Sequence, residues 1–296
     1  MHAQDGAKPS PHCALDKYAS IDLTMDEDIL VPVTLDGRAA FMVLEVGYGT
    51  TFIWDSFVKE AHIPANWVSN VFSEEEAPLF VATVQDFRLG PVRLGKALPQ
   101  IVPPSWMGIA KPRTGGAPVV GILGMNALSK VDFELDIAHR KLNLFSPTHC
   151  PGRVVYWTHE FASAPLQRDS AGNTFVVMEL EERKLEAMIR TARADTALEK
   201  GTARRLFGFD TGPGGAGDRY VAMKLTAPGL AAQNVRIDLT STSTEDNTCA
   251  LPVADSAGYR CAGYYPLQLG RNVLGALRLY FAVKEKTLYY TVADAN

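Results

Sequence analysis

Short apolar runs separated by tight polar turns dominate the chain and predict β-hairpins. Residues 29–44 alternate around Asp36-Gly37, a dipeptide typical of two-residue hairpin turns. Residues 174–189 have the same pattern around Glu181-Glu182. The sequence therefore predicts a mainly β protein with a hairpin near the start of each half.

Short amphipathic stretches follow these hairpins and predict helices of only one or two turns. The first two lie at residues 55–61 and 199–207. Two shorter ones, at 124–128 and 270–274, each follow an apolar strand and begin at a glycine. Each half of the chain is therefore expected to hold a few short helices on a β framework.

The two halves repeat one another at a nearly constant spacing. Arg190 lies 145 positions after Glu45, and Gly270 lies 146 positions after Gly124. The offset of 145 also relates three further pairs of residues: Val31 and Val176, Leu35 and Leu180, Thr51 and Thr196. Two copies of one unit predict two related lobes rather than a solenoid.

The repeat predicts how the chain divides. We expect an N-terminal segment at 1–22, an N-terminal lobe at 23–150 and a C-terminal lobe at 151–296, with the boundary near Pro151-Gly152. Residues 154–157 are apolar and could form a strand that crosses between the lobes. In the first lobe, a flap hairpin is expected within residues 70–89.

Composition excludes several kinds of partner. The 296 residues are 47% hydrophobic, enough for two cores, and carry a net charge of −4 without a Lys/Arg block, which argues against nucleic-acid binding. No apolar run reaches the roughly 18 residues of a membrane span. The histidines show no metal-ligand spacing, so no cofactor is expected. Residues 1–4 lack the basic and apolar regions of a signal peptide.

The four cysteines allow three disulfide connectivities. Cys13 precedes the first strand of lobe one and Cys150 follows its last, whereas Cys249 and Cys261 lie close together in a polar stretch. We predict the pairs Cys13–Cys150 and Cys249–Cys261, the first tying residues 1–22 to lobe one. Disulfides imply an oxidising compartment; the alternative is four buried free thiols.

Both halves resemble one motif, hydrophobic-hydrophobic-Asp-Thr-Gly-x-x-x-Thr, at residues 41–53 and 185–198. In each half a Gly-rich apolar block follows, at 121–128 and 267–274. From about Leu23 to Tyr290 the chain thus resembles the bacterial aspartyl proteases in which two retropepsin-like lobes are fused, as in pepsin. The resemblance implies two pseudo-symmetric β-barrel lobes and a periplasmic or secreted location.

The resemblance also shows that the catalytic aspartates are missing. In the family, two aspartates share one proton at the lobe interface and activate a water. Here Glu45 and Arg190 occupy these positions. The extra methylene of Glu45 moves its carboxyl by roughly an ångström, and the guanidinium of Arg190 cannot give up its proton.

The residues beside the two degenerate positions are also altered. Thr191 is kept, but Val46 replaces the matching threonine, so half of the hydroxyl-to-backbone bonds between the lobes should be missing. Gly47 is kept, but Ala192 replaces the matching glycine, and its Cβ is expected to crowd the turn.

Opposite charges at the two positions suggest an ion pair. If the two turns face each other as in the family, a bidentate Glu45–Arg190 pair would replace the shared proton as the tie between the lobes. The alternative is that both side chains point to solvent in a widened cleft.

Other acidic residues are weaker candidates for catalysis. Asp210-Thr211-Gly212 is a literal Asp-Thr-Gly, but a glycine-rich loop follows it without the required threonine or return strand. Asp55 and Asp195 lie near the starts of helical stretches, where aspartate commonly caps a helix.

The sequence favours a catalytically inactive aspartic-protease homologue that binds an extended peptide or a protein in the cleft between its lobes, or that acts as a scaffold for a partner. The alternative is an active aspartic endopeptidase that uses Glu45 and a second acid, so whether the chain is an enzyme stays open. The sequence contains no Gly-x-Ser-x-Gly motif, so it gives no support for a serine hydrolase. A two-lobed chain does not need a second copy to complete its cleft, so a monomer is expected.

Overall fold

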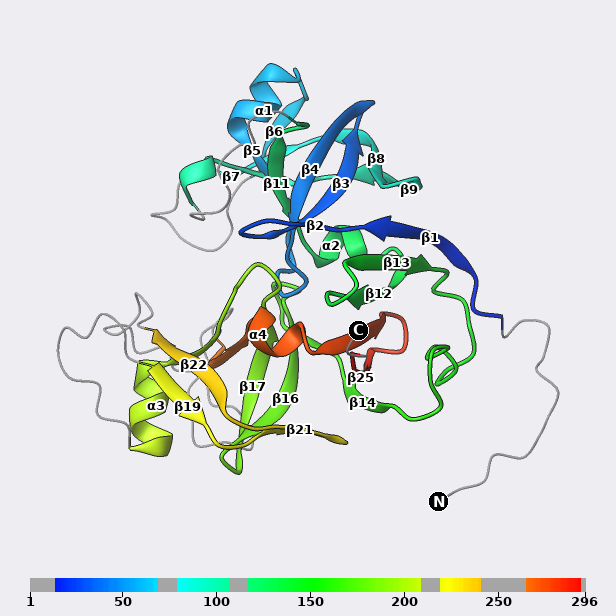
Figure 1. Cartoon of the computed structure of the whole chain (residues 1–296). Coiled ribbons are helices and arrows are strands. Elements are labelled where there is room, and N and C mark those ends of the chain that lie inside the picture. Colours follow the sequence, from blue (N-terminus) through cyan, green and yellow to red (C-terminus); the bar gives the residue numbers. More distant parts are fainter. Residues whose placement is uncertain (1–13, 69–78, 107–115, 209–218, 241–264, 294–296) are drawn as a thin grey trace.

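The computed structural model describes residues 14–68, 79–106, 116–208, 219–240 and 265–293. Within this part of the chain the strands form three sheets, one in each lobe and one shared between them. In Figure 1 the first lobe lies above the second, and the shared sheet lies beside their junction. The helices are short, as the sequence predicts.

The sheet of the first lobe has ten strands among the described residues. Nine of them form one path, and the tenth, β2 (Thr24–Met25), pairs with β3. In path order they are β6 (Ala65–Val68), β7 (Leu79–Ala82), β10 (Gln100–Val102), β5 (Phe52–Trp54), β11 (Val119–Leu123), β4 (Arg38–Leu44), β3 (Ile29–Leu35), β8 (Val84–Leu89) and β9 (Val92–Ala97).

The sheet of the second lobe has nine strands among the described residues, with β15 (Gln167–Arg168) paired to β16 outside the main path. The path runs through β19 (Arg219–Ala222), β22 (Val235–Thr240), β18 (Thr196–Glu199), β23 (Leu267–Leu269), β17 (Arg183–Ile189), β16 (Thr174–Leu180), β20 (Leu225–Ala227) and β21 (Leu230–Ala232).

The pairing of strands repeats between the lobes. β4 pairs in parallel with β11, and β17 pairs in parallel with β23. β5 lies antiparallel to β11 and parallel to β10, and β18 has the same relations to β23 and β22. β3 and β16 begin 145 residues apart, as do β4 and β17. The duplication seen in the sequence is therefore a duplication of topology.

The predicted hairpins form around left-handed turns. Asp36 and Gly37 have φ of 46° and 84° between β3 and β4, and Glu181 and Glu182 have φ of 45° and 67° between β16 and β17. Such φ values suit Asp-Gly but are unfavourable for two glutamates. Glu181 is held by its carboxylate, which accepts hydrogen bonds from the Tyr220 hydroxyl and the Met223 amide, both at 2.6 Å.

The helices fall in the predicted stretches. They are α1 (Asp55–Glu60), α2 (Met125–Leu128), α3 (Lys200–Phe207) and α4 (Arg271–Leu274), with a 3-10 turn at Pro104–Trp106. The capping prediction is wrong for Asp195, because Glu199 caps α3 by accepting from the amides of Gly201 and Thr202. Asp55 is the first residue of α1 rather than its cap.

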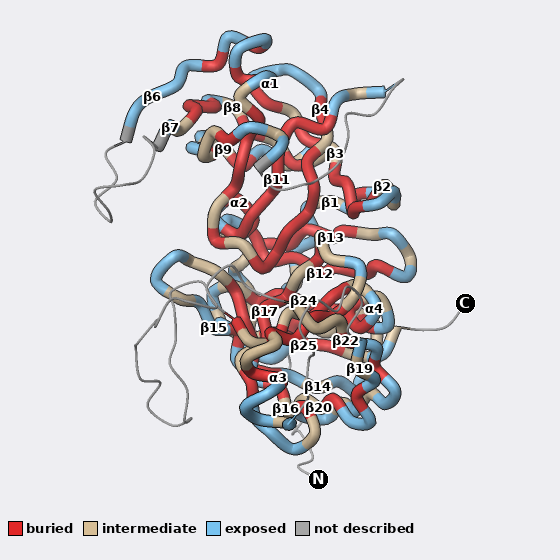
Figure 2. Tube along the Cα trace, turned by 90° about the vertical axis from the view of Figure 1, so that its left-hand side faces the viewer, coloured by how far each residue is buried: buried red, intermediate tan, exposed pale blue. Residues whose placement is uncertain are grey.

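Six strands from both halves of the chain form the shared sheet, in the order β1 (Lys17–Asp22), β13 (Lys141–Phe145), β12 (Asp132–Asp136), β24 (Leu277–Ala282), β25 (Thr287–Val292) and β14 (Ala162–Pro165). Antiparallel pairing of β12 with β24 joins the halves, with Phe133 opposite Phe281. β4, β11, β12 and β24 are largely buried, whereas β6 at the edge of the first lobe is mostly exposed (Figure 2).

Buried charges on one face of this sheet are paired, as burial requires. Asp132 accepts a hydrogen bond at 2.6 Å from Nε2 of His149. Glu134 contacts Nε of Arg278 at 2.8 Å and the hydroxyl of Tyr156 at 2.6 Å. His149 and Tyr156 belong to the connection between the lobes, which therefore covers this face.

Two predicted segments, the crossing strand and the flap, differ from the structure or lie partly outside its described residues. The strand predicted at residues 154–157 is wrong: the segment has no strand pairing, because β14 occupies the sheet edge, and Val154 instead packs on the buried core. Residues 70–78 of the predicted flap lie outside the described residues, and residues 79–89 form β7 and β8. The division of the chain at 1–22, 23–150 and 151–296 stays a prediction.

Candidate functional site

The turns that hold Glu45 and Arg190 meet between the lobes. Glu45 directly follows β4, and Arg190 directly follows β17. The parallel neighbour of each strand holds the turn, because the Glu45 amide donates to the Leu123 carbonyl at 3.0 Å and the Arg190 amide donates to the Leu269 carbonyl at 2.9 Å. Topologically equivalent strands therefore deliver both residues to one place.

A threonine and an asparagine hold each turn through hydrogen bonds. In the first lobe, the Thr51 amide donates to Oδ1 of Asn126 at 2.9 Å, and the Gly124 amide donates to the Thr51 hydroxyl at 3.1 Å. In the second lobe, Thr196 and Asn272 repeat the first of these bonds at 2.9 Å. The asparagines were missed as functional positions, although their spacing of 146 residues follows the repeat.

The predicted ion pair is present. Nε of Arg190 lies 3.1 Å from Oε2 of Glu45, and the Glu45 side chain has no exposed surface. Two backbone amides also donate to this carboxylate, that of Gly47 to Oε1 at 3.0 Å and that of Ala192 to Oε2 at 3.2 Å. The buried charge of Glu45 is therefore fully surrounded by donors from both lobes.

The predicted bidentate geometry is wrong. Within the described residues, the contact between Arg190 and Glu45 is made by Nε alone, because the other guanidinium nitrogens have other acceptors. Nη1 donates to Oε1 of Gln268 at 2.8 Å, and Nη2 donates to the hydroxyl of Tyr48 at 2.9 Å. The guanidinium carbon also lies 4.6 Å from the centre of the Tyr48 ring.

The structure shows the expected loss of half of the hydroxyl-to-backbone hydrogen bonds between the lobes. The Thr191 hydroxyl donates to the Leu44 carbonyl at 2.6 Å and accepts from the Val46 amide at 3.1 Å, which ties lobe two to lobe one. The buried side chain of Val46 has no hydroxyl with which to return these bonds.

Gly47 occupies a position where no side chain fits. A Cβ there would lie 2.3 Å from the backbone oxygen of Ile189 in the other lobe. Ala192, which replaces the equivalent glycine, carries its Cβ in a half-buried position and packs against the core. The two turns are therefore no longer equivalent in their packing.

Charge around the pair is dominated by arginine. Burial, the largest single influence, disfavours the charged guanidinium of Arg190, but Glu45 and Tyr48 together outweigh it and raise the pKa of Arg190 above its ordinary value. Burial, with the charge of Arg190, lowers the pKa of Arg193. Burial also raises the pKa of Tyr48, so its hydroxyl stays protonated.

One further buried acid lies within electrostatic range. Asp28 is 9% exposed, and its pKa is raised mainly by burial, with a smaller contribution from Glu45. Arg271 opposes this rise and lies 3.8 Å from the Asp28 carboxylate. Arg271 also donates to the Thr191 carbonyl at 3.1 Å, so it links lobe one to the second turn.

The other candidate acids are not brought to the pair by any described contact. Asp55 pairs with Lys59 on the surface of α1, at 2.9 Å. The backbone oxygen of Asp195 accepts from Nε of Arg193 at 3.0 Å. Asp210-Thr211-Gly212 lies outside the described residues.

Sequence reasoning missed Tyr48 and Gln268. Each could have been noticed as a mismatch of the repeat, since Tyr48 aligns with Arg193 and Gln268 aligns with Ile122. The signal is weak, because many surface positions also differ between the copies.

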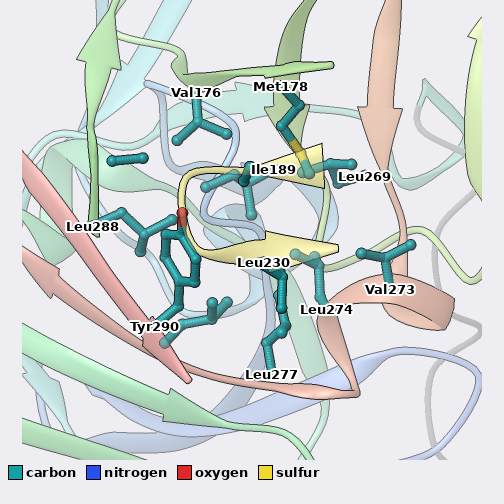
Figure 3. Close-up of a pocket in the computed structure, with 13 residues that line it drawn as sticks. Val176, Met178, Ile189, Leu230, Leu269, Val273, Leu274, Leu277, Leu288 and Tyr290 are labelled. Carbon is teal, nitrogen blue, oxygen red and sulfur yellow. The ribbon is translucent and has the colours of Figure 1, made fainter. Parts of the chain in front are cut away.

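The second lobe holds a small apolar cavity (Figure 3). Its volume is about 30 Å³, and its lining includes Val176, Ile189, Leu230 and Tyr290. Pockets for small-molecule ligands occupy roughly 300–1,000 Å³. The cavity is therefore a packing defect of the lobe rather than a substrate site.

The structure also bears on disulfide bonding, metal binding and membrane insertion. Cys150 is disulfide-bonded, while Cys13, Cys249 and Cys261 lie outside the described residues, so the pairing stays a prediction. The described part of the chain has no group of three or more His, Cys, Asp or Glu residues suited to a metal ion. None of its helices is long and apolar enough to cross a membrane.

No family model matches the sequence, and no curated protein matches it significantly. Among solved structures, conglutin gamma, a basic 7S globulin from lupine seeds, is similar with a TM-score of 0.51 and 13% identity over 95% of this chain and 96% of its own. Basic 7S globulin from soybean gives a TM-score of 0.51 and 10% identity, with the same coverage.

A retropepsin-like aspartic protease from Rickettsia conorii is 18% identical over 47% of this chain and 98% of its own, with a TM-score of 0.30. At such identities, the likeness to the two globulins concerns the fold alone. It confirms the predicted architecture, a mainly β, two-lobed acid-protease fold with few short helices.

Proposed function

We propose that this protein is a catalytically inactive member of the bacterial two-lobed aspartyl proteases, and that the groove between its lobes binds an extended peptide. One observation carries the proposal: an arginine that cannot lose its proton lies 3.1 Å from the only acid at the two catalytic positions. An aspartic dyad needs two carboxylates that share one proton.

The environment of Glu45 supports the same conclusion. Its two oxygens already accept from Arg190, Gly47 and Ala192, and its side chain has no exposed surface. A general base must reach a water and take its proton. A carboxylate that is shielded and paired in this way has no place for that water.

Incubation with an unfolded protein at pH 3 to 7 tests inactivity. We expect no cleavage by the natural chain, with or without an aspartic-protease inhibitor. Inhibitor-sensitive cleavage that disappears in Glu45→Gln would favour the alternative, an active endopeptidase with atypical acids. Asp28 is then the second acid to test, because Asp28→Asn would remove the buried carboxyl that is electrostatically coupled to Glu45.

Reversion tests whether the groove still accepts a substrate. The variant combines Glu45→Asp, Val46→Thr, Arg190→Asp and Ala192→Gly, which restores the family motif in both lobes. Weak, inhibitor-sensitive cleavage by this variant would support a groove that still holds a peptide. If a stably folded revertant does not cleave, peptide binding by the natural chain has to be shown directly.

We also propose a periplasmic or secreted monomer with the disulfides Cys13–Cys150 and Cys249–Cys261. The disulfide-bonded state of Cys150 supports an oxidising compartment. Mass mapping of non-reduced peptides tests the pairing, and light scattering coupled to gel filtration tests the monomer. A reduced protein or a stable dimer would contradict these two points separately.

A further inference from the structure

The contacts of Arg190 turn its two neutral neighbours into hydrogen-bond donors. Nη2 of Arg190 donates to the Tyr48 oxygen at 2.9 Å, so the hydroxyl hydrogen of Tyr48 points elsewhere. Nη1 donates to Oε1 of Gln268 at 2.8 Å, which fixes the orientation of that amide and leaves its NH₂ group to donate. Among the described residues, neither the Tyr48 hydroxyl hydrogen nor the Gln268 NH₂ group has an acceptor.

The guanidinium keeps donors of its own. A guanidinium carries five N–H groups, and those on Nε, Nη1 and Nη2 that contact Glu45, Gln268 and Tyr48 account for three of them. One N–H therefore remains on each terminal nitrogen. The Arg190 side chain is 16% exposed, and Tyr48 and Gln268 are half-buried, so none of the three residues is sealed inside the core.

The local charge favours an anion. The charged groups that act on Tyr48 are Arg190, Glu45 and Arg193, which together carry one positive charge more than they carry negative. Two acids, Asp238 and Asp195, act in turn on Arg193. Glu45 is fully buried behind Arg190, so a ligand that approaches Tyr48 and Gln268 meets the cation first.

We propose that Tyr48, Arg190 and Gln268 bind a carboxylate of the peptide ligand. The inference rests on the proposed peptide-binding function and names the chemical class of its anchor. A carboxylate offers two oxygens with about four acceptor positions, which matches four kinds of unused donor: the Tyr48 O–H, the Gln268 NH₂ and one N–H on each of two Arg190 nitrogens. Hydrogen bonds from a guanidinium to a carboxylate are also stronger than those to a neutral carbonyl.

Acetate tests the carboxylate site without any peptide. The side-chain Nε–Hε signal of Arg190 is followed by NMR in the full chain, with sodium chloride replaced stepwise by sodium acetate at constant ionic strength. We expect a saturable shift in the natural chain that weakens at least threefold in Tyr48→Phe. That variant keeps the ring under the guanidinium and removes only the hydroxyl.

Capped peptides then distinguish the sources of the carboxylate. Ac-Ala-Ala-Asp-Ala-Ala-NH₂ is compared with its Asn counterpart and with Ac-Ala-Ala-Ala-Ala-Ala carrying a free C-terminus. We expect at least tenfold tighter binding of one carboxylate peptide than of the Asn peptide, and loss of this preference in Gln268→Glu, which places an anion beside the site. Lys59→Gln, a charge change on the exposed face of α1, serves as control.

The outcomes separate the two proposals. Equal binding of the Asp and Asn peptides with no saturable acetate shift overturns the carboxylate site and leaves peptide binding in place. A saturable acetate shift that is lost in Tyr48→Phe, with no peptide bound, supports the carboxylate site and overturns the peptide groove. An acetate shift that is unchanged in Tyr48→Phe and in Gln268→Glu, both folded, overturns the assignment to these residues.

Discussion

Removing the cation of the Glu45–Arg190 pair should strongly destabilise the protein. Arg190→Met keeps a long apolar side chain but takes away the guanidinium that lies 3.1 Å from the Glu45 carboxylate. Glu45 has no exposed surface, so water cannot replace the lost charge. Breaking a buried ion pair by removing one partner costs about 3–5 kcal/mol.

The structure places the expected value at the lower end of that range. In Arg190→Met the carboxylate would still accept from the amides of Gly47 and Ala192. We therefore expect a loss of about 3 kcal/mol, a large share of a total stability of about 5–15 kcal/mol. With a urea dependence of about 2 kcal/mol per molar, the midpoint should fall by about 1.5 M.

A double-mutant cycle isolates the pair. Glu45→Gln keeps one oxygen that can accept from the Ala192 amide, but its NH₂ group then faces the donating amide of Gly47. Arg190 stays partly exposed to water, so the substitution should cost about 1–2 kcal/mol. In the double variant no unpaired buried charge remains. It should therefore be more stable than Arg190→Met alone, with a coupling energy of at least about 2 kcal/mol.

Urea unfolding followed by far-UV circular dichroism and by tryptophan fluorescence gives these values, and the two transitions must coincide for a free energy to be defined. An Arg190→Met variant that loses less than about 1 kcal/mol, or a cycle that is additive within about 0.5 kcal/mol, would refute the reasoning that this pair ties the lobes together.

Three further predictions concern the second lobe. Glu182→Gly should raise the stability by up to about 1 kcal/mol, because Glu182 has a φ of 67° that glycine adopts without strain. Val176→Ile should raise it by about 0.5–1 kcal/mol by filling part of the 30 Å³ cavity. Burial would raise the pKa of Asp169, but hydrogen bonds, first that of the Tyr265 hydroxyl, outweigh burial and lower the pKa. The stabilisation by this carboxylate is therefore complete above its ordinary pKa of 3.8 and is lost as pH falls through the lower folded-state pKa. Asp169→Asn should reduce stability at pH 7 and flatten its fall below pH 4.

The first two of these predictions have a control in the same turn or strand, and thermal or urea unfolding measures all three. Glu181→Gly removes the carboxylate bonds to Tyr220 and Met223 and should destabilise the protein. Val177→Ile adds the same methylene at a 38% exposed position and should change little. A Glu182→Gly or Val176→Ile variant that melts below the natural chain contradicts its prediction, as does an Asp169→Asn variant with an unchanged acid limb.

Local patterns in the sequence were enough to predict the elements. Apolar alternation and turn residues gave the hairpins at β3–β4 and β16–β17, because strand formation and turn geometry depend on neighbouring residues. The spacing of 145 residues predicted that both lobes share one topology. The resemblance of both turns to one motif singled out Glu45 and Arg190, which the structure brings into contact.

Errors arose where a neighbour in space competes with a neighbour in sequence. Asp195 has a residue type common at helix caps, but Glu199 reaches the free amides of α3 directly. Residues 154–157 are apolar enough for a strand, but β14 already occupies the sheet edge. In both cases the sequence shows the propensity, and packing selects which residue uses it.

The sequence by itself determined the mainly β fold, the duplication and the presence of opposite charges at the two matching turn positions, Glu45 and Arg190. Only the tertiary structure decided how those charges are used: Arg190 gives one donor each to Glu45, Tyr48 and Gln268. The physical reason is that periodicity and turn chemistry act over a few residues. The direction of a guanidinium depends instead on acceptors that lie 145, 142 and 78 positions away and meet it only when both lobes are folded.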